Sequence, residues 1–351
     1  MPLRSKPYRV IQWATGAVGR YAIAAIHENP AFELAGCWVH AADKVGRDAG
    51  LIAGIGAIGV AATHSIEEIL ALDADAVLYA PLLSNADEIC RILEAGKNVV
   101  TPTGFTSVRD PELAARLEAA CQRGRSSLHG SGIHPGFSGD RLPLVLSALA
   151  RRIDRIRVYE IVDMSQMSES PELVAMLGFD MSAEKARIEP PALLGVMSTI
   201  FFESIALVAQ GLGLEIEEFE SRHEFALAKR DIPIAQGRVR KGHVAGQHFH
   251  YAGLVRGEPA IAFETYWKMA KDLEPDWPYD DVWRYDVELE GDPPMKLEFR
   301  CGSGSDGPEL GLLCTAMNCV NSIPHVVAAA PGIRTQLDLP LVTAVGAMRR
   351  A

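Results

Sequence analysis

The sequence predicts an α/β protein with two domains. At roughly 150 residues per domain, its 351 residues are enough for about two. Strand-like and helix-like segments alternate over the first third of the chain, which is typical of a parallel sheet covered by helices. After Gly130 the pattern changes to strands joined by turns. This second pattern is typical of an α+β domain around an open, mostly antiparallel sheet.

In the first third, short apolar runs indicate the strands and capping residues indicate where the helices begin. Ser65 and Glu68 match the S-x-x-E capping box, and Asn85 precedes a second helix. Asp110 and Pro111 supply an N-cap and an N1 proline for a third. The expected strands are 8–14, 32–40, 74–80, 97–101 and 126–129, and the expected helices are 17–28, a short one after Ser65, 85–96 and 110–121.

The glycine-rich segment that begins at Gly130 contains a proline and is typical of a boundary or a ligand-facing loop. We place the boundary near Gly136. The first domain is therefore expected to span 1–136 and to be completed by 309–351, with a second domain over 137–308. The expected elements beyond the boundary are strands 155–163, 222–227, 237–251, 259–269, 282–290 and 296–300, and helices 171–177, 191–214 and 309–327.

The charge balance argues against two classes of partner. Lys and Arg number 34 against 45 Asp and Glu, which gives a net charge of −11. Nucleic acid and anionic membranes both require a basic surface, so we expect neither as a partner. The apolar stretch 191–214 is long enough to span a bilayer, but Glu203 lies at its middle and basic flanks are missing. We interpret it as a buried helix.

The cysteines and the N-terminus point to the cytoplasm. No apolar segment of signal-peptide length precedes the first strand. The cysteines lack CxxC spacing and are expected to be reduced thiols in a cytoplasmic protein. They are Cys37, Cys90, Cys121, Cys301, Cys314 and Cys319.

The turn after the first strand carries a dinucleotide-binding pattern. It reads Ala14-Thr15-Gly16-Ala17-Val18-Gly19-Arg20, the G-x-G-x-x-G fingerprint with Ala14 in place of the first glycine. A strand precedes it, a helix follows, and a second strand comes at the right interval, as a Rossmann βαβ unit requires. The pyrophosphate is expected at the N-terminus of the helix, where free N–H groups favour anions. The residues expected to contact it are Thr15, Gly16, Ala17, Val18 and Gly19.

The end of the second strand bears on the choice between NAD and NADP. Enzymes selective for NAD carry Asp or Glu there, whereas this chain has His40. Lys44 and Arg47 follow within the next seven residues and are able to neutralise a 2′-phosphate. We therefore expect His40, Lys44 and Arg47 to bind the cofactor, with NADP(H) favoured and NAD(H) as the alternative.

Several blocks of sequence, in register along nearly the whole chain, resemble the dihydrodipicolinate reductase-like superfamily. The similarity is greatest to 2,4-diaminopentanoate dehydrogenases and native amine dehydrogenases. It implies a Rossmann domain, an α+β domain with an open sheet, a homodimer, and reversible hydride transfer between NAD(P)H and an imine formed from a carbonyl compound and ammonia. The blocks are RVIQWATGAVGR, DKVGRDAG, AGKNVVTPTGF, HGSGIHPGF and NSIPHVVAAAPG.

The same resemblance implies further cofactor contacts and one departure. Members that act as amine dehydrogenases are expected to carry a glutamate in the loop after strand 97–101, where it orients ammonia. Here that loop reads Thr101-Pro102-Thr103-Gly104-Phe105, without an acid. The implied contacts are Ala80 and Pro81 at the end of strand 74–80, Thr101, Pro102 and Thr103 at the end of strand 97–101, and His134, Pro135, Asn321 and Pro324.

Two residues are candidates for proton transfer. Glu160 lies between apolar neighbours on a predicted strand, which fits a general acid, and alternation places Val162 on its face and Asp163 on the other. His134, in the glycine-rich loop, is able to donate a proton or to bind the nicotinamide. An ion-paired strand residue remains the alternative for Glu160.

A second group of residues is predicted to line the substrate pocket. His248 and His250 share one face of a strand, but no neighbouring carboxylate or cysteine completes a metal site, so no metal is expected. The predicted pocket consists of Phe105, Val162, Asp163, His248, His250 and Trp267.

The function expected from these observations is an amine dehydrogenase-like, NAD(P)-dependent oxidoreductase with a small carbonyl or amine substrate and ammonia. Two alternatives stay open because of the acid-free loop at Thr101–Phe105. One is a carbonyl or alcohol oxidoreductase that does not use ammonia, and the other is a dinucleotide-binding protein without turnover.

Overall fold

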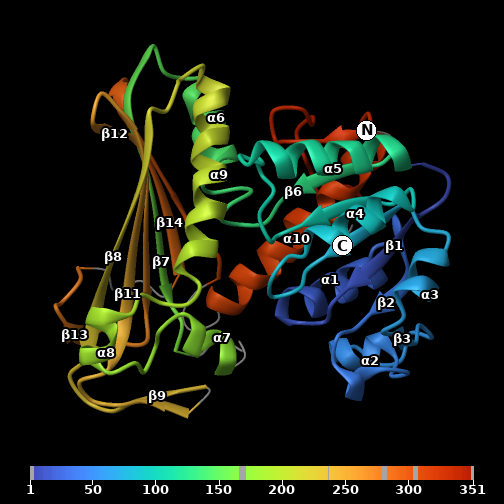
Figure 1. Cartoon of the computed structure of the whole chain (residues 1–351), viewed down its shortest axis with the longest axis horizontal. Coiled ribbons are helices and arrows are strands. Elements are labelled where there is room, and N and C mark those ends of the chain that lie inside the picture. Colours follow the sequence, from blue (N-terminus) through green and yellow to red (C-terminus); the bar gives the residue numbers. More distant parts are fainter. Residues whose placement is uncertain (1–3, 166–170, 236, 279–282, 303–306, 349–351) are drawn as a thin grey trace. The chain divides into compact units, whose positions relative to one another are not determined.

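The computed structural model describes residues 4–165, 171–235, 237–278, 283–302 and 307–348. The chain forms two compact units, and each is described by itself (Figure 1). Unit 1 runs to Phe137 and resumes at Leu312, whereas unit 2 runs from Ser138 to Gly311. The C-terminal segment therefore belongs to the same unit as the N-terminus.

Unit 1 is built on a parallel sheet in the order β16-β6-β5-β4-β1-β2-β3. The order 3-2-1-4-5-6 is that of a Rossmann domain, here extended at one edge by β16. The strands are β1 (Tyr8–Trp13), β2 (Phe32–Trp38), β3 (Ala62–Thr63), β4 (Ala76–Tyr79), β5 (Asn98–Thr101), β6 (Ser127–Gly130) and β16 (Gly332–Ile333).

The helices of unit 1 begin at the residues that the capping patterns indicate. The Ser65 hydroxyl accepts from the Glu68 N–H, and Asn85 and Asp110 cap their helices in the same way. Only half of the predicted capping box forms, because Glu68 bonds Thr63 instead of the Ser65 N–H. The helices are α1 (Ala17–Glu28), the 3-10 turn η1 (Ala42–Lys44), α2 (Ala49–Ala53), α3 (Ile66–Ala71), α4 (Ala86–Glu94), α5 (Pro111–Gly124) and most of α10 (Gly307–Ala328).

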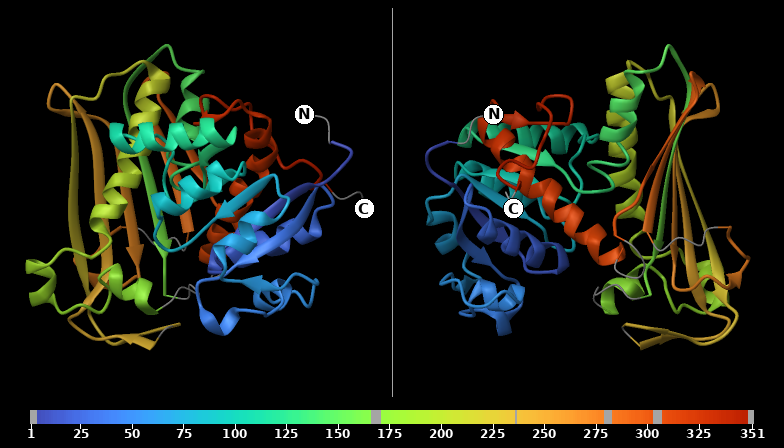
Figure 2. Two further views of the ribbon diagram at one scale, coloured as in Figure 1. Left: turned by 45° about the vertical axis from the view of Figure 1, so that its right-hand side comes forward. Right: turned by 180° about the vertical axis from the view of Figure 1, so that it is seen from behind.

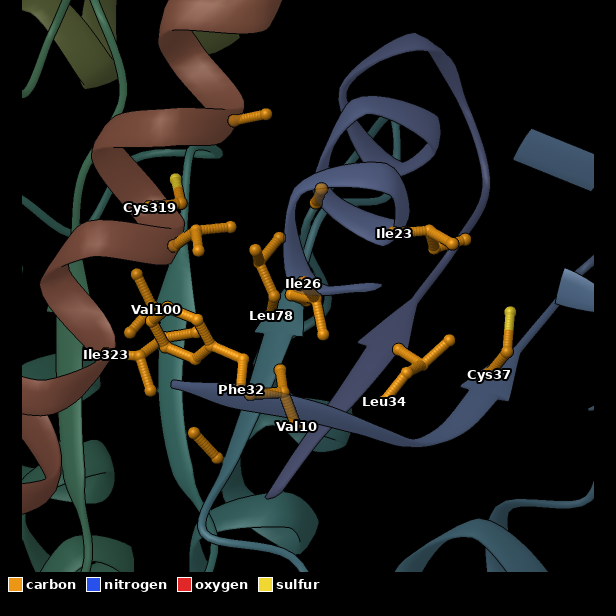
Figure 3. Packing of buried hydrophobic residues seen from close by; sticks show 14 of the residues in the cluster. Val10, Ile23, Ile26, Phe32, Leu34, Cys37, Leu78, Val100, Cys319 and Ile323 are labelled. Carbon is orange, nitrogen blue, oxygen red and sulfur yellow. The ribbon is translucent and has the colours of Figure 1, made fainter. Parts of the chain in front are cut away.

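Apolar residues cover both faces of the parallel sheet. One cluster joins β1, β2, β4 and β5 to α1 and α10, and a second joins the sheet to α3, α4 and α5. Figure 3 shows Ile323 of α10 beside Val100 of the sheet; Cys319 of α10 and Leu78 belong to the same cluster, and all four are fully buried. Helix α10 thus completes the core of unit 1 although it is more than 170 residues distant from β6 in sequence.

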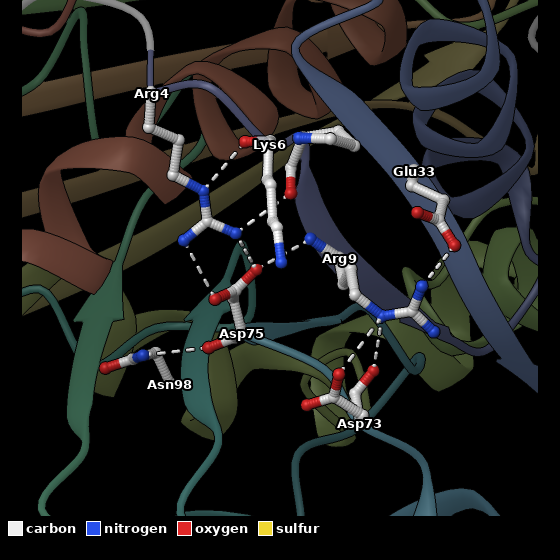
Figure 4. A network of polar contacts seen from close by, with 8 residues as sticks. Arg4, Lys6, Arg9, Glu33, Asp73, Asp75 and Asn98 are labelled. Atoms are coloured by element: carbon white, nitrogen blue, oxygen red, sulfur yellow. Dashed lines mark hydrogen bonds and ion pairs between the residues drawn. The ribbon is translucent and has the colours of Figure 1, made fainter.

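A polar network ties the amino ends of the strands together (Figure 4). The Arg4 guanidinium binds both oxygens of Asp75 at 3.0 and 2.5 Å, and the Arg9 N–H donates to the same carboxylate at 2.8 Å. Asn98 donates to the Asp75 carbonyl at 2.8 Å. Ligands of open parallel sheets bind at the carboxyl ends of the strands, so we assign this network to the stability of the fold.

Unit 2 contains a mixed sheet in the order β13-β8-β11-β12-β7-β14-β15, and among its described strands only β12 and β7 pair in parallel. A separate hairpin pairs β9 with β10. The strands are β7 (Arg152–Asp163), β8 (Glu218–Ala228), β9 (Ile232–Ile234), β10 (Gly237–Val239), β11 (Val244–Val255), β12 (Glu258–Lys268), β13 (Leu273–Glu274), β14 (Trp283–Asp292) and β15 (Met295–Phe299).

Helix α9 (Leu194–Leu212) packs on one face of this sheet (Figures 1 and 2). The Phe201 ring stacks on Tyr251 at 4.7 Å and meets the edge of Phe263 at 6.2 Å. The face that carries Tyr251 and Phe263 is therefore the covered face of the sheet. Three short helices complete the unit: α6 (Arg141–Ser147), α7 (Pro171–Met176) and α8 (Ala183–Ile188).

Several features of unit 2 differ from the sequence expectation, among them the short strands β9 and β13, which were not expected. The single strand expected over 237–251 is broken into β10 and β11, because Gly242 turns the chain with a left-handed φ of +76°. Helices α6 and α8 were not expected. Both have an N-cap, since Asp140 accepts from the Arg141 N–H and Ser182 accepts from the Lys185 N–H.

Two helices of the described chain, Leu194–Leu212 and Glu309–Ala328, are long and apolar enough to cross a membrane by length and composition. Their apolar side chains also have partners within the two units. Phe201 and Ile205 of α9 are buried in unit 2, and Ile323 of α10 is buried in unit 1. Part of the hydropathy of each helix is therefore used in packing within its unit.

Candidate cofactor site and catalytic face

The turn after β1 holds a conformation that favours glycine, although Ala14 occupies it. Ala14 has a φ of +70°, which is left-handed. Two hydrogen bonds hold it there: its N–H donates to the Trp38 carbonyl at 2.9 Å, and the Gln12 side chain donates to its carbonyl at 2.9 Å. The backbone thus adopts at Ala14 the turn that the first glycine of the fingerprint usually makes.

The two remaining glycines of the fingerprint have different roles. A Cβ on Gly19 would lie 2.3 Å from the Ala14 carbonyl oxygen, so the close approach of α1 to the turn requires glycine there. A Cβ on Gly16 would meet nothing within 4 Å. The space beside Gly16 is therefore open, as the approach of a pyrophosphate to the backbone requires.

The N-terminus of α1 is suited to an anion. Gly16 is the N-cap and provides no side-chain acceptor, and the first turn holds no acidic residue. The first N–H groups of the helix have no partner within it, and the helix dipole adds positive potential at this end. A phosphate bound there would satisfy these donors.

The predicted NADP residues lie after β2. The Lys44 ammonium donates to the Thr15 hydroxyl at 3.2 Å and lies 3.4 Å from the Thr15 carbonyl, so it reaches the turn itself. His40 and Arg47 are exposed. Asp48, which the sequence reasoning missed, organises the following loop: it accepts four backbone N–H groups, and the one from Ile58 contributes most to holding the pKa of its carboxyl below the ordinary value.

The loops after β5 and β6 meet at the carboxyl edge of the sheet. A Cβ on Gly130 would lie 2.4 Å from the Gly104 carbonyl oxygen, so the two loops touch there. The Thr101 and Thr103 hydroxyls are 2.7 Å apart and hold the first loop. Phe105 is 7% exposed and packs in the core of unit 1.

Two amides that sequence reasoning missed fasten the glycine-rich loop. Asn318 of α10 donates to the carbonyls of Gly132 and Gly136 at 2.6 and 3.1 Å, and Gln336 donates to Gly136 at 3.0 Å. No local pattern signals either residue, because both act across a long sequence separation. The loop also contains the peptide that joins His134 to Pro135, which is cis.

The remaining cofactor residues predicted from the resemblance lie near these loops along the chain. Ala80 and Pro81 directly follow β4 and are half-buried. Asn321 and Pro324 lie on α10, one turn beyond Asn318, and Pro324 is buried. Ser322, between them, lies 3.4 Å from the Ser131 hydroxyl after β6, so this part of α10 contacts the same loop.

In unit 2, strand register places Glu160 in a row across the covered face. Glu160 of β7 lies opposite Thr265 of β12 and Tyr285 of β14, and paired residues direct their side chains to the same side. The Tyr285 hydroxyl donates to Glu160 Oε1 at 2.7 Å. Glu160 is 7% exposed, and Tyr285 and Thr265 are buried. In this row the Glu160 carboxyl group is buried and accepts a hydrogen bond from the phenol of Tyr285.

A second tyrosine of this face, Tyr251, is affected by the charge of Glu160. Tyr251 is fully buried, and its pKa is raised, chiefly by burial and further by the charge of Glu160. A raised pKa keeps the Tyr251 phenol protonated at neutral pH. The covered face therefore carries the Glu160 carboxyl group together with the hydroxyl groups of Tyr285, Thr265 and Tyr251.

The opposite face carries a different carboxylate. Glu264 accepts from His248 Nε2 at 2.7 Å and from His250 Nδ1 at 2.8 Å, and His248 stacks on Tyr266 at 4.1 Å. Burial alone would raise the pKa of Glu264, but the hydrogen bonds from both imidazoles lower it to about 2. Among the described residues, no group of three or more ligands is arranged to hold a metal ion.

The structure thus divides the predicted pocket residues among three places. Val162 and Trp267 are in register and share the face of Glu160. Asp163, His248 and His250 lie on the opposite face. Asp163 is three residues from Glu160 on the same strand, and side chains of a strand alternate between its two faces. The two histidines pair with Tyr266 and Glu264, the neighbours of Thr265, which shares the face of Glu160. Phe105 belongs to unit 1. Alternation in the sequence predicts which residues of one strand share a face. It does not predict which faces of neighbouring strands lie on the same side of the sheet, because that depends on the register between strands.

These features define a class: a dinucleotide-binding oxidoreductase with a Rossmann unit and a mixed-sheet unit that carries a buried carboxylate. Residues 137–351 match the family model of the 2,4-diaminopentanoate dehydrogenase C-terminal domain, and residues 10–123 match that of the dihydrodipicolinate reductase N-terminus. The first match covers more than half of the chain. The chain belongs to the family of 2,4-diaminopentanoate dehydrogenases and amine dehydrogenases.

Individual proteins agree with this assignment. An amine dehydrogenase from Streptomyces virginiae is 33% identical over 97% of this chain and 98% of its own length. A 2,4-diaminopentanoate dehydrogenase from Acetoanaerobium sticklandii is 25% identical over 74% of this chain and 71% of its own. The solved amine dehydrogenase from Mycobacterium smegmatis has the same fold, with a TM-score of 0.78 at 20% identity, over 98% of this chain and 99% of that one. The chain is therefore an amine dehydrogenase-like oxidoreductase with a nicotinamide cofactor.

Proposed function

We propose that the chain catalyses reversible hydride transfer between NADP(H) and an imine formed from a small ketone or aldehyde and ammonia. The observation that carries the proton chemistry is the buried Glu160–Tyr285 hydrogen bond of 2.7 Å. The amine class comes from the names of the two curated relatives. The open turn at Gly16 and the unpartnered N–H groups of α1 support the cofactor.

In the reductive direction, ammonia adds to the carbonyl carbon, the oxygen leaves as water, and the C=N bond of the protonated imine takes the hydride to give the amine. The nicotinamide supplies that hydride when bound. Glu160 acts as the proton-exchanging group: as an acid it gives a proton to the departing oxygen, and as a carboxylate it stabilises the positive iminium. Tyr285 orients Glu160 through its hydroxyl, and Thr265 lies beside it in the row.

The preference for NADP over NAD is part of the proposal. Lys44 reaches the turn through Thr15, and β2 is followed by His40 where NAD enzymes carry an acid. The exposed Arg47 is available to a 2′-phosphate. Replacing both Lys44 and Arg47 with alanine should raise KM for NADPH more than tenfold and leave KM for NADH nearly unchanged. A cofactor preference that stays the same would contradict this assignment.

His134 is proposed to contact the nicotinamide carboxamide. It belongs to the loop that Asn318 and Gln336 fasten from α10 and the C-terminal segment, so its backbone is held in place. In His134→Asn, which retains a hydrogen-bonding side chain, KM for the cofactor should rise while kcat changes less than in Glu160→Gln. A drop in kcat as large as that of Glu160→Gln would instead make His134 the proton donor.

One observation favours a second candidate function. The loop Thr101–Phe105 is fixed by two threonine hydroxyls and contains no carboxylate, so ammonia lacks the acceptor that the family resemblance implies. A carbonyl or alcohol oxidoreductase needs no such acceptor. The same loop also keeps open the third alternative, a dinucleotide-binding protein without turnover.

The deciding experiment follows the absorbance of NADPH and NADH with a panel of aliphatic and aromatic ketones and aldehydes, at about pH 9, with and without excess ammonium chloride. Sodium chloride at equal ionic strength is the control. Turnover that requires ammonium supports the amine dehydrogenase. Turnover that does not depend on ammonium supports the carbonyl oxidoreductase. Cofactor binding without turnover of any compound in the panel supports the dinucleotide-binding protein without enzymatic activity.

We also propose that the chain works as a homodimer in the cytoplasm, without nucleic acid or membrane as a partner. Its six cysteines are free thiols, and burial raises the pKa of Cys37 and Cys319 to about 12, which leaves them protonated and unreactive. Free thiols are typical of a reducing compartment. Sedimentation velocity in a reducing buffer tests the dimer, and a single monomeric species would contradict it.

A further inference from the structure

Unit 2 holds a cavity that the proposed reaction does not use. It has a volume of about 550 Å³, within the range of small-molecule sites. It lies where β7 begins, between the α6–β7 segment, the end of α9 and the β11–β12 hairpin, at the end of the sheet that is uppermost in Figure 1. Its nearest residue on the covered face of β7, Ile156, precedes Glu160 by four residues, or roughly 13 Å along a strand.

About half of the lining is apolar. Four of its elements contribute the aliphatic residues that are called the apolar patch below. They are Ile153 and Ile156 of β7, Leu212 and Leu214 at the end of α9, Val255 of β11 and Ile261 of β12. A ligand therefore needs an apolar portion of similar extent to displace water from this patch.

Most of the charges in the lining already have partners in the chain. Arg151 donates through Nε to Asp292 at 2.7 Å, and Arg152 donates through Nε to Asp154 at 2.9 Å. These pairs neutralise two of the three arginines of the lining and its Asp154. They leave one arginine and one glutamate.

The arginine that remains is Arg155. It is half-buried, and its Nε donates to the Pro259 carbonyl at 3.0 Å, which fixes the plane of the guanidinium. Its two terminal amino groups bond to none of the described residues. The glutamate is Glu258, the neighbour of Pro259, which forms no hydrogen bond or ion pair within the described part of the chain. One cation and one anion thus remain available on the same cavity.

We propose that this cavity binds an apolar α-amino acid as its zwitterion. The carboxylate pairs with the terminal amino groups of Arg155, the ammonium pairs with Glu258, and the aliphatic side chain packs on the apolar patch. A ligand with one charge of each sign leaves no group of the lining unpaired, whereas a simple carboxylate or amine leaves one. The fixed guanidinium plane favours a carboxylate, because a planar guanidinium and a carboxylate are able to form two parallel N–H···O hydrogen bonds.

Three probes with one carbon skeleton test the proposal: L-leucine, 4-methylpentanoate, which lacks the ammonium, and 3-methylbutylamine, which lacks the carboxylate. Binding to the full chain without cofactor is measured by isothermal titration calorimetry, and hydrogen–deuterium exchange of segments 147–156 and 255–261 locates it. We expect L-leucine to bind most tightly and to protect both segments. Each missing charge should weaken binding roughly tenfold to a hundredfold.

Two variants separate the two charges. Arg155→Gln should weaken L-leucine to the level of 3-methylbutylamine, and Glu258→Gln should weaken it to the level of 4-methylpentanoate. Arg187→Gln and Glu184→Gln, on the exposed surface of α8, are the matched controls and should leave binding unchanged. Thermal denaturation of all four variants verifies that they fold.

The proposal is overturned if L-leucine shows no saturable binding, if the three probes bind equally, or if Arg155→Gln and Glu258→Gln bind L-leucine as the controls do. Protection confined to segments outside the cavity would also overturn it. None of these measurements depends on turnover, so the outcome is independent of the proposed reaction.

Discussion

Glu160 and Glu264 lie on adjacent strands of one sheet but face opposite sides. Glu160 receives a hydrogen bond from the neutral phenol of Tyr285, whereas Glu264 is held by two imidazoles, one on each oxygen. Donors on both oxygens stabilise the ionised form, which suits an anchor and not a group that exchanges protons. The register of the strands and the hydrogen-bond donors therefore give the buried Glu160 and the half-buried Glu264 different roles.

The largest effect should come from Glu160→Gln. The amide keeps the shape of the side chain but exchanges no proton, so kcat should fall about a hundredfold to ten-thousandfold while the Kd of the cofactor stays the same. Stopped-flow and steady-state rates with the best substrate of the panel measure it. Glu264→Gln is the matched control, and a comparable loss of kcat in that variant would remove the distinction between the two faces.

Glu264→Gln should instead lower stability. Hydrogen bonds from the imidazoles lower the pKa of Glu264 from 4.5 to about 2 against the effect of burial, and at about 1.4 kcal/mol per pKa unit this corresponds to about 3 kcal/mol. A lowered pKa stabilises the fold above pH 4.5, and the contribution is lost as the pH falls towards 2. In urea unfolding, the difference in the free energy of unfolding between Glu264→Gln and the unmodified protein should be smaller at pH 3 than at pH 7. A difference that is independent of pH would contradict the ionised anchor.

Tyr285→Phe should have a smaller effect on the rate. It retains the ring between Trp283 and Phe299 and removes only the hydroxyl that donates to Glu160. We expect kcat to fall roughly tenfold, the equivalent of one hydrogen bond to a charged group, with little change in the free energy of unfolding. Tyr266→Phe, on the other face, is the control. If both variants retain full activity, Tyr285 does not position Glu160.

The smallest effect should be that of His250→Gln. The glutamine amide is able to donate to Glu264, and His248 still holds the other oxygen, so the loss of stability should be about 1 kcal/mol. Thermal unfolding at pH 7 measures it, with the exposed His27→Gln as a control. A loss as large as that of Glu264→Gln would show that His250 alone holds the carboxylate.

The elements of unit 1 follow closely from the sequence because their signals are local. Ser65, Asn85 and Asp110 cap the helices that they were expected to cap, and the turn at Gly16–Gly19 joins β1 to α1. Neither signal depends on distant residues. The residues that hold the turn and the glycine-rich loop from a distance, such as Gln12 and Asn318, were missed for the same reason.

The predicted substrate pocket shows where local signals end. Alternation correctly paired Glu160 with Val162 and His248 with His250, because the period of two is a property of one strand. Alternation does not predict which residues of β11 lie on the same side of the sheet as Glu160 of β7. That relation depends on pairing through β12, and Glu264, which links the two histidines, lies 14 residues from His250.

The sequence by itself determined the family, the Rossmann turn and the positions of the longer strands, because hydrophobic period, caps and glycine positions act over a few residues. Only the tertiary structure decided that Ala14 adopts the left-handed turn of a glycine, that Glu160 receives its hydrogen bond from Tyr285, and that Arg155 and Glu258 border one cavity. Each of these depends on backbone pairing between segments distant in the chain. Register and packing fix such contacts, and neither leaves a pattern in the local sequence.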